Sequence, residues 1–355
     1  GRNTGTKILA DGNSIRTFGF AKEIGENPNV PGPTIEVNEG DSVIIDFWNI
    51  SQGAPHTIHL HGLDVDQQND GVPHLSFEVH HMEHGFYHFK APHAGTYLYH
   101  CHVVSSIHVQ AGMYGLFVVK PSNGSNQTWD GGYEIQSEAR IFMSEIDTNW
   151  HLDSVLLHEY DTATSHHMVP IPVYNPQHFL INGLSEQQLV DKVRIIGQAN
   201  SNIYLRLANI GFTANRVIFP SGMKARTIDS DGRPLPSEEI TNTVEVYPGE
   251  RYGVLCNPST EMQGALHIQY VNMNTRIIEN EQEVEIDISG FWGVADQPSS
   301  DLGLFPNPVS DELVISDPFG RLNAAKDIVI TSLNGMIVKR VKWQAFASQT
   351  IQVSD

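Results

Sequence analysis

The sequence predicts an all-β protein built from β-sandwiches, and three observations favour this fold class. Its 355 residues are enough for two or three domains, each with a core of its own. Charged residues make up only 17% of the chain, whereas Gly and Pro are frequent, as expected where many strands are joined by turns. Short segments alternate apolar and polar residues, and no long stretch has helical periodicity.

Residues 1–121 are expected to form the first sandwich. Two alternating runs separated by a Gly-Asp turn occur in PGPTIEVNEGDSVIIDFWNIS, which spans residues 31–51. A second strand pair, turned near residues 92–95, is expected in GFYHFKAPHAGTYLYHCH, and GMYGLFVVKP supplies a further strand. The polar, Gly-rich stretch that follows, PSNGSNQTWDGG, predicts a linker or a long surface loop.

Residues 133–290 show the same pattern and predict a second sandwich. Strands are expected in EARIFMSEID, QHFLINGLS, KVRIIGQA, IYLRLANIG, TVEVYPGERYGVLC and ALHIQYVNM. Residues 151–175 are weakly patterned and are expected to be irregular. A second linker, VADQPSSDLG, precedes residues 302–355, a β-rich segment that we expect to be a separate small β-sandwich module.

The composition also bears on possible partners. A formal net charge of −20 argues against nucleic acid or an anionic membrane surface as a partner. No apolar run approaches the roughly 20 residues that a membrane-spanning helix needs. Two cysteines imply no disulfide framework. Because the chain starts at Gly1 without a signal peptide, we expect a mature or recombinant form.

Histidines are concentrated in one part of the chain, with twelve of the eighteen between Pro55 and Met113. Their spacing is ordered, because PHTIHLHG is followed forty residues later by YLYHCHVVSSIHVQAGM. Imidazole and thiolate ligands suit copper, and two His, one Cys and a weak axial Met form a blue, or type 1, copper site. Surface histidines scattered at random would not produce these spacings, so the stretch predicts a metal site.

Strand geometry divides these histidines into two sites. Neighbouring side chains on a strand point to opposite sides, so Cys101 can face one metal while His100 and His102 face another. The same alternation directs His56 to the Cys101 site and turns His59 and His61 away from it. The predicted type 1 copper ligands are His56, Cys101, His108 and Met113. The predicted ligands of a second copper cluster are His59, His61, His100 and His102.

These motifs resemble a known family. PGPTIEV, HxxHxHG, DGVP, AGTYLYHCH and GMYGLFVV are similar to the cupredoxin domains of multicopper oxidases, which include laccases and copper nitrite reductases. PQHFLINGLS, YLRLANIG and VYPGERYGVL extend the resemblance over roughly residues 30–290. It implies two cupredoxin-like Greek-key sandwiches. It also implies one-electron oxidation of a phenolic or metal-ion donor at a type 1 copper of low to medium potential, with transfer through His-Cys-His to a type 2/type 3 cluster that reduces O2.

The sequence departs from the laccase pattern in two ways. A trinuclear cluster needs eight histidines, and the second sandwich contains no HxH pair to supply the other four. The spacing from Cys101 to His108 is two residues longer than in a typical laccase.

Copper nitrite reductases are the alternative, because their type 2 copper lies between subunits and His61 and His100 fit that scheme. Against it, His59 stands where that family has a catalytic Asp, and Met273 stands where it has a histidine. A third possibility is a non-enzymatic electron-transfer or copper-binding cupredoxin. Two-domain members need a partner chain to complete the interdomain copper site, which favours a homotrimer.

Several other titratable residues near the motifs are open to more than one interpretation. Asp70, in DGVP, either relays protons to bound oxygen or is a turn residue before Gly71. Four further histidines form a second group: His74, His80, His81 and His84. They either supply the missing copper ligands, capture Cu(I) together with Met82, line the substrate rim, or lie on a solvated surface. His88 and His93 are expected to be structural. His166 and His167 could reach a neighbouring subunit's copper site, and His267 is expected to be an ordinary strand residue.

The C-terminal module resembles the sorting domain of Bacteroidetes proteins exported by type IX secretion. LFPNPVSDELVI and ITSLNG carry this resemblance. It implies export across the outer membrane and a secreted or cell-surface location. The last strands of that domain type are absent, so we expect the module to be truncated at Asp355.

Overall fold

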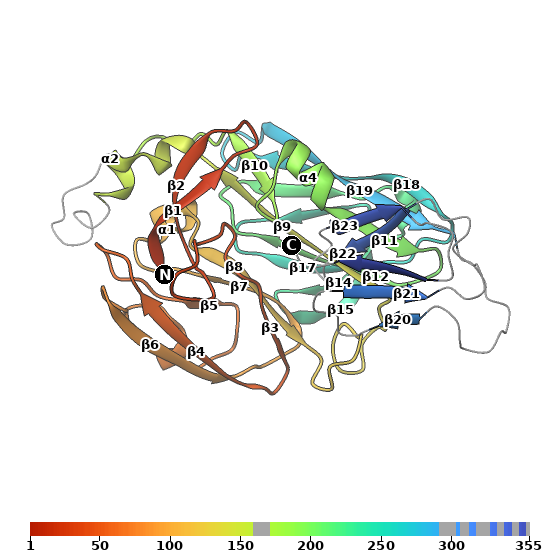
Figure 1. The fold of residues 1–355 in the computed structure, drawn as a ribbon, viewed down its shortest axis with the longest axis horizontal. Helices are drawn as coiled ribbons and strands as arrows, with labels where there is room; N and C mark the ends of the chain where they lie inside the picture. Colours follow the sequence, from red (N-terminus) through yellow and green to blue (C-terminus); the bar gives the residue numbers. More distant parts are fainter. Residues whose placement is uncertain are drawn as a thin grey trace.

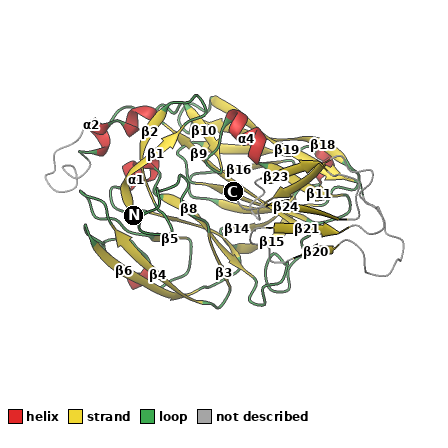
Figure 2. Ribbon diagram, in the orientation of Figure 1, coloured by secondary structure: helices red, strands yellow, loops and turns green. Residues whose placement is uncertain are grey.

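The computed structural model describes residues 1–158 and 171–290, together with the strands at 303–305, 312–316, 327–331, 337–342 and 348–352. The described chain is mostly strand with a few short helices, which confirms the predicted fold class (Figure 2). The first sandwich lies at the red and orange end of the chain, beside the second sandwich in green and cyan (Figure 1).

The first domain contains two sheets. A four-stranded sheet has the order β3 (Ile35–Asn38), β8 (Tyr114–Lys120), β7 (Gly95–His100) and β5 (His59–His61). It faces a two-stranded antiparallel sheet of β4 (Ser42–Asn49) and β6 (Glu83–Lys90). Alternation directs the buried side chains Phe47 of β4, Tyr87 of β6 and Phe117 of β8 into one core.

The expected pairing of β6 with β7 is wrong, because these consecutive strands belong to different sheets. β6 pairs with β4, whereas β7 pairs with β5 and β8. The turn between them is held instead by backbone hydrogen bonds that join Ala91 to Gly40 and Asp41. The chain therefore crosses from one layer of the sandwich to the other at this point.

An N-terminal hairpin forms a sheet of its own, from β1 (Arg2–Ile8) and β2 (Ser14–Gly19). Phe18 of β2 is fully buried. Its ring meets the rings of His56 and His108 edge-on, with centroids 6.4 and 5.8 Å away. The hairpin thus closes one side of the predicted type 1 site.

The second domain is a larger sandwich. One sheet has the order β10 (His178–Ile181), β9 (Ser137–Ile146), β12 (Ile203–Asn209), β17 (Arg251–Cys256), β14 (Arg226–Ser230) and β15 (Arg233–Ile240). The other has the order β11 (Arg194–Gln198), β19 (Ile278–Ser289), β18 (Met262–Val271), β13 (Ala214–Ile218) and β16 (Thr243–Val246). All six segments expected to be strands are strands. β13, β14, β15 and β19 lie outside the segments expected to be strands.

Short helical segments fill some connections. They are η1 (Gln67–Asn69), α1 (Ser105–Ala111), η2 (Thr148–His151), α2 (Asp153–Leu156), α4 (Glu186–Lys192) and η3 (Ser221–Met223). α1 begins after Val104, which has φ 45°, and ends at Gly112, which has φ 115°. η2 and α2 replace part of the segment expected to be irregular, and residues 159–170 lie outside the described residues.

Arginines from the second domain join it to the first. Arg206 of β12 is 1% exposed. Its Nε lies 2.9 Å from Glu138 Oε2, and its Nη1 donates to Thr96 Oγ1 of β7 at 3.0 Å. Arg140 of β9 donates to Glu36 Oε1 of β3 at 2.8 Å. Because these contacts are largely shielded from water, removal of one partner costs more than removal of one partner of a surface ion pair.

The Glu36 contacts predict a loss of stability in acid. Burial raises the pKa of Glu36, but the hydrogen bonds and charges of Arg140 and Lys120 outweigh it and lower the pKa to about 2. Folding lowers this pKa, so the ionised Glu36 carboxylate stabilises the folded protein at pH values above the ordinary pKa of 4.5. This stabilisation is lost as the pH falls toward 2. Because the Glu36 side chain is partly exposed, we expect its ionised form to contribute about 1–3 kcal/mol to the free energy of unfolding at neutral pH.

The measurement is urea unfolding of the protein and of Glu36→Gln, each at pH 7 and pH 3. Glu36→Gln should be less stable than the parent protein at pH 7, and the difference between their free energies of unfolding should be smaller at pH 3. An equal gap at both pH values would contradict this role for Glu36.

The C-terminal segment contains two small sheets. One joins β20 (Gly303–Phe305), β21 (Glu312–Ser316) and β24 (Ser348–Gln352), and the other joins β22 (Asp327–Thr331) to β23 (Ile337–Lys342). Residues 306–308, which carry part of the sorting-domain resemblance, lie outside the described residues. Among the residues that are described, no helix has the length and apolar character needed to cross a membrane.

Candidate metal centres

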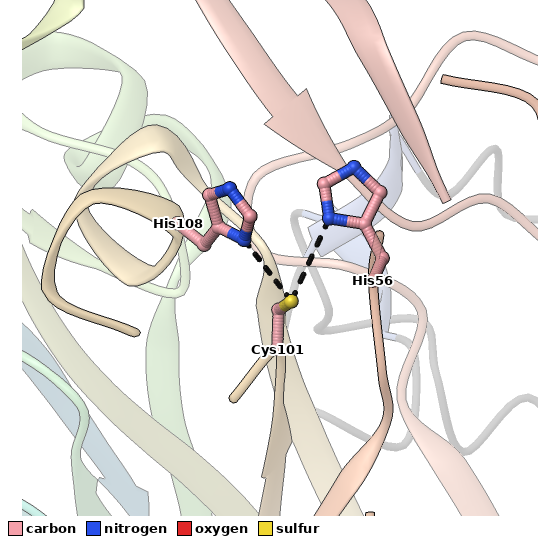
Figure 3. Close-up of side chains that lie close together, drawn as sticks. All are labelled: His56, Cys101 and His108. Atoms are coloured by element: carbon pink, nitrogen blue, oxygen red, sulfur yellow. Dashed lines mark hydrogen bonds between the residues drawn. The ribbon is translucent and has the colours of Figure 1, made fainter. Parts of the chain in front are cut away.

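Three predicted ligands converge in the first domain. Cys101 follows β7, His108 lies on α1, and His56 precedes β5. Cys101 Sγ lies 3.6 Å from His56 Nδ1 and 3.1 Å from His108 Nδ1 (Figure 3). Reciprocal backbone hydrogen bonds of 3.0 Å with Val79 hold His56 in place. All three ligand side chains are buried.

The chemistry of this donor set fits a soft-to-borderline metal ion. Burial lowers the pKa of His56 well below its ordinary value, so the ring is neutral and keeps a free lone pair. Two imidazole nitrogens and one sulfur around a common point, shielded from water, suit copper. The residues present therefore fit the predicted type 1 copper.

Met113 is tied by its backbone to the other ligands of this site. The Cys101 amide donates to the Met113 carbonyl at 3.0 Å, and the Met113 amide donates to the His108 carbonyl at 2.9 Å. The Met113 side chain is buried in the same core as Cys101. Its role as the weak axial ligand remains a prediction.

A second set of histidines converges across the pairing of β5 with β7. His59 lies opposite His100 in the register, and His61 Nδ1 is 3.2 Å from His100 Nε2. The donor atoms of His59, His61 and His100 all lie within 4.8 Å of one another. His102 lies beside them, with its ring centroid 5.1 Å from that of His59. The structure thus separates the histidines into the two groups that strand alternation predicts.

Burial favours the neutral form of three histidines of the second group. It lowers the pKa of His61 to about 4 and that of His100 to about 3, and it also lowers the pKa of His102. His100 Nδ1 donates to the Cys101 carbonyl at 3.0 Å, and His59 Nδ1 donates to the Asp70 carbonyl at 2.8 Å, because a carbonyl oxygen only accepts. Both rings therefore carry a lone pair on Nε2, the atom that would bind a metal ion, and in His100 this atom lies 3.2 Å from His61 Nδ1.

The second domain contacts this group through β17 and the turn before it. A Cβ atom on Gly249 would lie 3.1 Å from His61 Cε1. Arg251 is buried, donates from Nε to the Thr96 carbonyl at 3.2 Å, and adds to the lowering of the His61 pKa. Neither residue was a predicted site residue, because nothing in the spacing of the histidines indicates which part of the second sandwich reaches them.

Gly62, directly after His61, is expected to tolerate no side chain. Its φ is +85°, and an added Cβ would overlap the Arg251 guanidinium. We expect Gly62→Ala to cost about 1–3 kcal/mol of unfolding free energy through backbone strain alone, and to displace His61. Denaturant unfolding together with the copper content of the second cluster measures both effects.

Gly124→Ala is the matched control for Gly62→Ala, since Gly124 also has positive φ (+66°) but open space around its Cα. Copper loss in both variants would contradict a local effect at His61.

Asp70 lies at the second group. It ends η1, and its Oδ2 is 3.5 Å from His59 Nδ1. Its carbonyl also accepts the backbone hydrogen bond of Leu60 at 3.2 Å. Asp70 is therefore both a structural turn residue and a carboxylate within reach of the cluster, and the structure is compatible with both interpretations.

The remaining histidines of the dense segment do not join these sites. Three sets of His, Cys and acidic side chains converge in the described part of the chain, and none of the three includes His74, His80, His81 or His84. These four are exposed. His84 stacks on Trp48 at 4.3 Å, and His88 contacts Ser42 Oγ at 3.2 Å. His166 and His167 lie outside the described residues.

Comparisons with known proteins agree with this geometry. Two family profiles, both described as multicopper oxidase, match residues 13–124 and 147–284. The chain is 24% identical over 277 residues to an L-ascorbate oxidase of Cucurbita pepo var. melopepo, a match that covers 71% of this chain and 47% of that protein. It is 33% identical over 135 residues to a copper-containing nitrite reductase of Neisseria meningitidis serogroup B, covering 38% of this chain and 32% of that protein.

Solved structures of copper oxidases and copper nitrite reductases share the fold of this chain. The blue copper oxidase of Nitrosomonas europaea superposes with a TM-score of 0.62 at 26% identity, over 81% of this chain and 83% of that one. A copper nitrite reductase of Nitrosomonas europaea shares the fold, with a TM-score of 0.59 at 17% identity, over 81% of this chain and 92% of that one. The chain spans about half the length of the ascorbate oxidases it matches.

Proposed function

This chain belongs to the multicopper oxidase family, and from that premise we propose that it couples one-electron oxidation of a small donor to the reduction of O2. The observation that carries the proposal is the position of Cys101. Its sulfur belongs to one group of converging ligands, while the neighbouring His100 belongs to the other. A few covalent bonds along the strand end therefore connect the two candidate copper centres.

The residues of the chain have distinct parts in this proposal. Copper, when bound, supplies the reversible one-electron chemistry at both centres. His56, Cys101, His108 and Met113 would hold the copper ion that accepts the electron. The hydrogen bond from His100 Nδ1 to the Cys101 carbonyl shortens the connection between the two centres. We assign Asp70 the supply of protons at the second cluster, since its carboxylate faces His59 and is in contact with solvent.

A cavity of about 270 Å³ in the first domain supports a small aromatic donor. Its lining is mainly apolar and includes Phe20, Ile24, Phe47, Ile58 and Tyr99. Gly1 also lines it, and a Cβ atom on Gly1 would lie 3.3 Å from Met113 Cε. A phenolic ring in this cavity would therefore lie close to the Met113 side of the type 1 site.

Ile24→Trp tests the cavity as the donor site. We expect the larger side chain to raise KM for a phenolic donor about tenfold with little change in kcat, because it obstructs binding and leaves the copper ligands untouched. Oxidation of Fe(II) should be unaffected. Ile8→Trp, at an exposed position on β1 outside the cavity, is the control. An unchanged KM for phenols in Ile24→Trp would exclude this cavity.

We also propose that the active form is a homotrimer. The second cluster has four histidines from the first domain, and a trinuclear centre needs more ligands than these. His59 and His61 retain some exposure, so a neighbouring chain can approach them. Light scattering combined with metal analysis tests this proposal. A monomer that holds a full complement of copper would overturn it.

A nitrite reductase is the second candidate, and one observation favours it. The close approach of His61 and His100 suits a single type 2 ion completed by a partner chain, as the resemblance implies. His59 and Met273 replace two functional residues of that family, and Met273 is exposed beyond the end of β18. We therefore place the oxidase first.

The C-terminal strands support a further proposal, that the protein is exported and acts outside the cell. The two small sheets agree with a β module, and the LFPNPVSDELVI and ITSLNG segments supply the resemblance. Fractionation of cells expressing the chain with and without residues 302–355 tests it. Retention of both forms inside the cell would contradict export.

Copper-loaded protein distinguishes the functions. We expect metal analysis and paramagnetic resonance to show a type 1 signal and at least one further copper, and an oxygen electrode to record O2 uptake with a phenol, Fe(II) or Cu(I). Nitric oxide production from nitrite without O2 uptake would favour the nitrite reductase. One blue copper per chain without turnover would overturn both and leave an electron-transfer protein.

A further inference from the structure

A third group of metal-ligating side chains lies on the outer face of the second domain. His267 is on β18, and Glu281 and Glu283 are on the neighbouring β19. His267 Nδ1 lies 3.1 Å from Glu281 Oε1 and 3.3 Å from Glu283 Oε1. One donor atom from each of the three lies within 4.8 Å of the other two. An ion could therefore contact all three without a rearrangement of the backbone.

The register of the two strands creates this arrangement. His267 lies directly opposite Glu283, and Gln269, two residues further along β18, lies opposite Glu281. Side chains two residues apart on a strand share one face, so all four project from the same side of the ladder. Gln269 donates from Nε2 to Glu281 Oε2 at 2.8 Å, which orients the carboxylate and leaves Oε1 toward His267.

The charges along β19 favour a cation at this position. Four acidic residues alternate along one face of the strand, namely Glu281, Glu283, Glu285 and Asp287. Arg194 of β11 pairs with Glu285 and Asp287. The ion pairs of Glu281 and Glu283 in the described structure are with His267. Two carboxylates two residues apart repel each other, and a divalent ion between them would remove that repulsion.

We propose that His267, Glu281 and Glu283 form a binding site for a divalent transition-metal ion such as Zn²⁺, separate from the two copper centres. One imidazole and two carboxylates provide one nitrogen and at least two oxygen ligands, and this borderline set suits Zn²⁺ better than Mg²⁺ or Ca²⁺, which prefer oxygen alone. The three side chains remain partly exposed, which leaves room for water to complete the coordination.

The site has a predictable consequence for the fold. An ion held by both β18 and β19 ties together the two longest strands of the five-stranded sheet. Because it binds the folded arrangement and not the unfolded chain, it should raise the unfolding temperature of this domain as its concentration increases. The proposal does not depend on the oxidase function, since no residue of the copper centres takes part.

Calorimetric titration of copper-loaded protein with ZnCl2 tests the site. Loss of an outer-shell partner typically weakens metal binding about 10- to 100-fold, so we expect Zn²⁺ binding to be weakened by at least that factor in His267→Asn and in Glu281→Gln, which each lose a direct ligand. A thermal melt of the same samples should show a Zn²⁺-dependent rise in the unfolding temperature for the parent protein that both variants lack. MgCl2 should produce neither effect at the same concentration.

Two variants serve as controls. Glu239→Gln removes the same charge at an exposed position on β15 and should bind Zn²⁺ as the parent protein does. Gln269→Leu leaves the three ligands in place but releases Glu281, so it should weaken binding less than loss of a ligand. Absence of Zn²⁺ binding by the parent protein, or equal binding by His267→Asn, Glu281→Gln and Glu239→Gln, would overturn the proposal.

Discussion

Cys101→Ser is expected to remove the blue absorption band and to reduce donor oxidation to the level of the copper-free protein. The thiolate is the ligand that defines a type 1 copper, and a hydroxyl is a poor substitute for it. The same substitution also removes the sulfur from the connection between the two centres. Cys101 is fully buried between His56 and His108, so the thiol occupies the centre of this ligand group. Absorption spectroscopy and oxygen uptake measure the two losses.

Cys256→Ser provides the matched control. Cys256 is equally buried, but it belongs to the core of the second domain. Its replacement should lower stability because a hydroxyl is placed among apolar side chains, while the blue band of the folded protein is retained. A blue band that survives in Cys101→Ser would show that another sulfur holds the copper, and it would refute the assigned ligand set.

Arg206→Met should produce the largest loss of stability among the substitutions considered. Arg206 contacts Glu138 and Thr96, and its guanidinium lies 4.7 Å from the centre of the Tyr204 ring. Removal of Arg206 leaves Glu138, in a mostly buried position, with the ion pair to Arg140 Nε at 3.1 Å but without its second partner, so we expect a cost near the lower end of about 3–5 kcal/mol. Since the contact with Thr96 crosses to the first domain, the two domains should also unfold less cooperatively. Urea unfolding followed by fluorescence and by the blue band reports on both domains.

Arg216→Met is the comparison for this experiment. Arg216 pairs with Glu245 at 3.0 Å, but both side chains are more than one third exposed. An exposed pair of this kind contributes about 0–1 kcal/mol, because water screens the charges. Equal losses in the two variants would show that burial of Arg206 has no special effect on stability.

The candidate site was largely predictable because it depends on strand alternation. A period of two along His100-Cys101-His102 directs the thiol to one side and the imidazoles to the other, and the structure places Cys101 and His100 in different groups. The two cupredoxin-like sandwiches followed from the same alternation and from the family motifs. What the sequence could not show is which sheet a strand joins, as β6 and β7 demonstrate, because sheet assignment depends on contacts distant in the chain.

Other features lacked a local signal altogether. β19 was missed because its outward positions are acidic and Glu is depleted in strands, although Val284, Ile286 and Ile288 alternate on its buried face. α1 was missed because its seven residues are too few to show helical periodicity and it begins without a side-chain cap. The approach of Arg251 to His61 joins residues 190 positions apart, and no short motif encodes such a contact.

The loop from Cys101 to Met113 has a consequence for the entropy cost of forming the predicted type 1 site. Three of the four predicted type 1 ligands lie within this one short segment, and backbone hydrogen bonds between Cys101, Met113 and His108 close it on itself. Closing a short loop costs little chain entropy, since the cost grows with loop length. His56, by contrast, arrives from 45 residues away. Cys101, His108 and Met113 therefore come together at a low cost in chain entropy, whereas bringing His56 to them closes a longer loop and costs more.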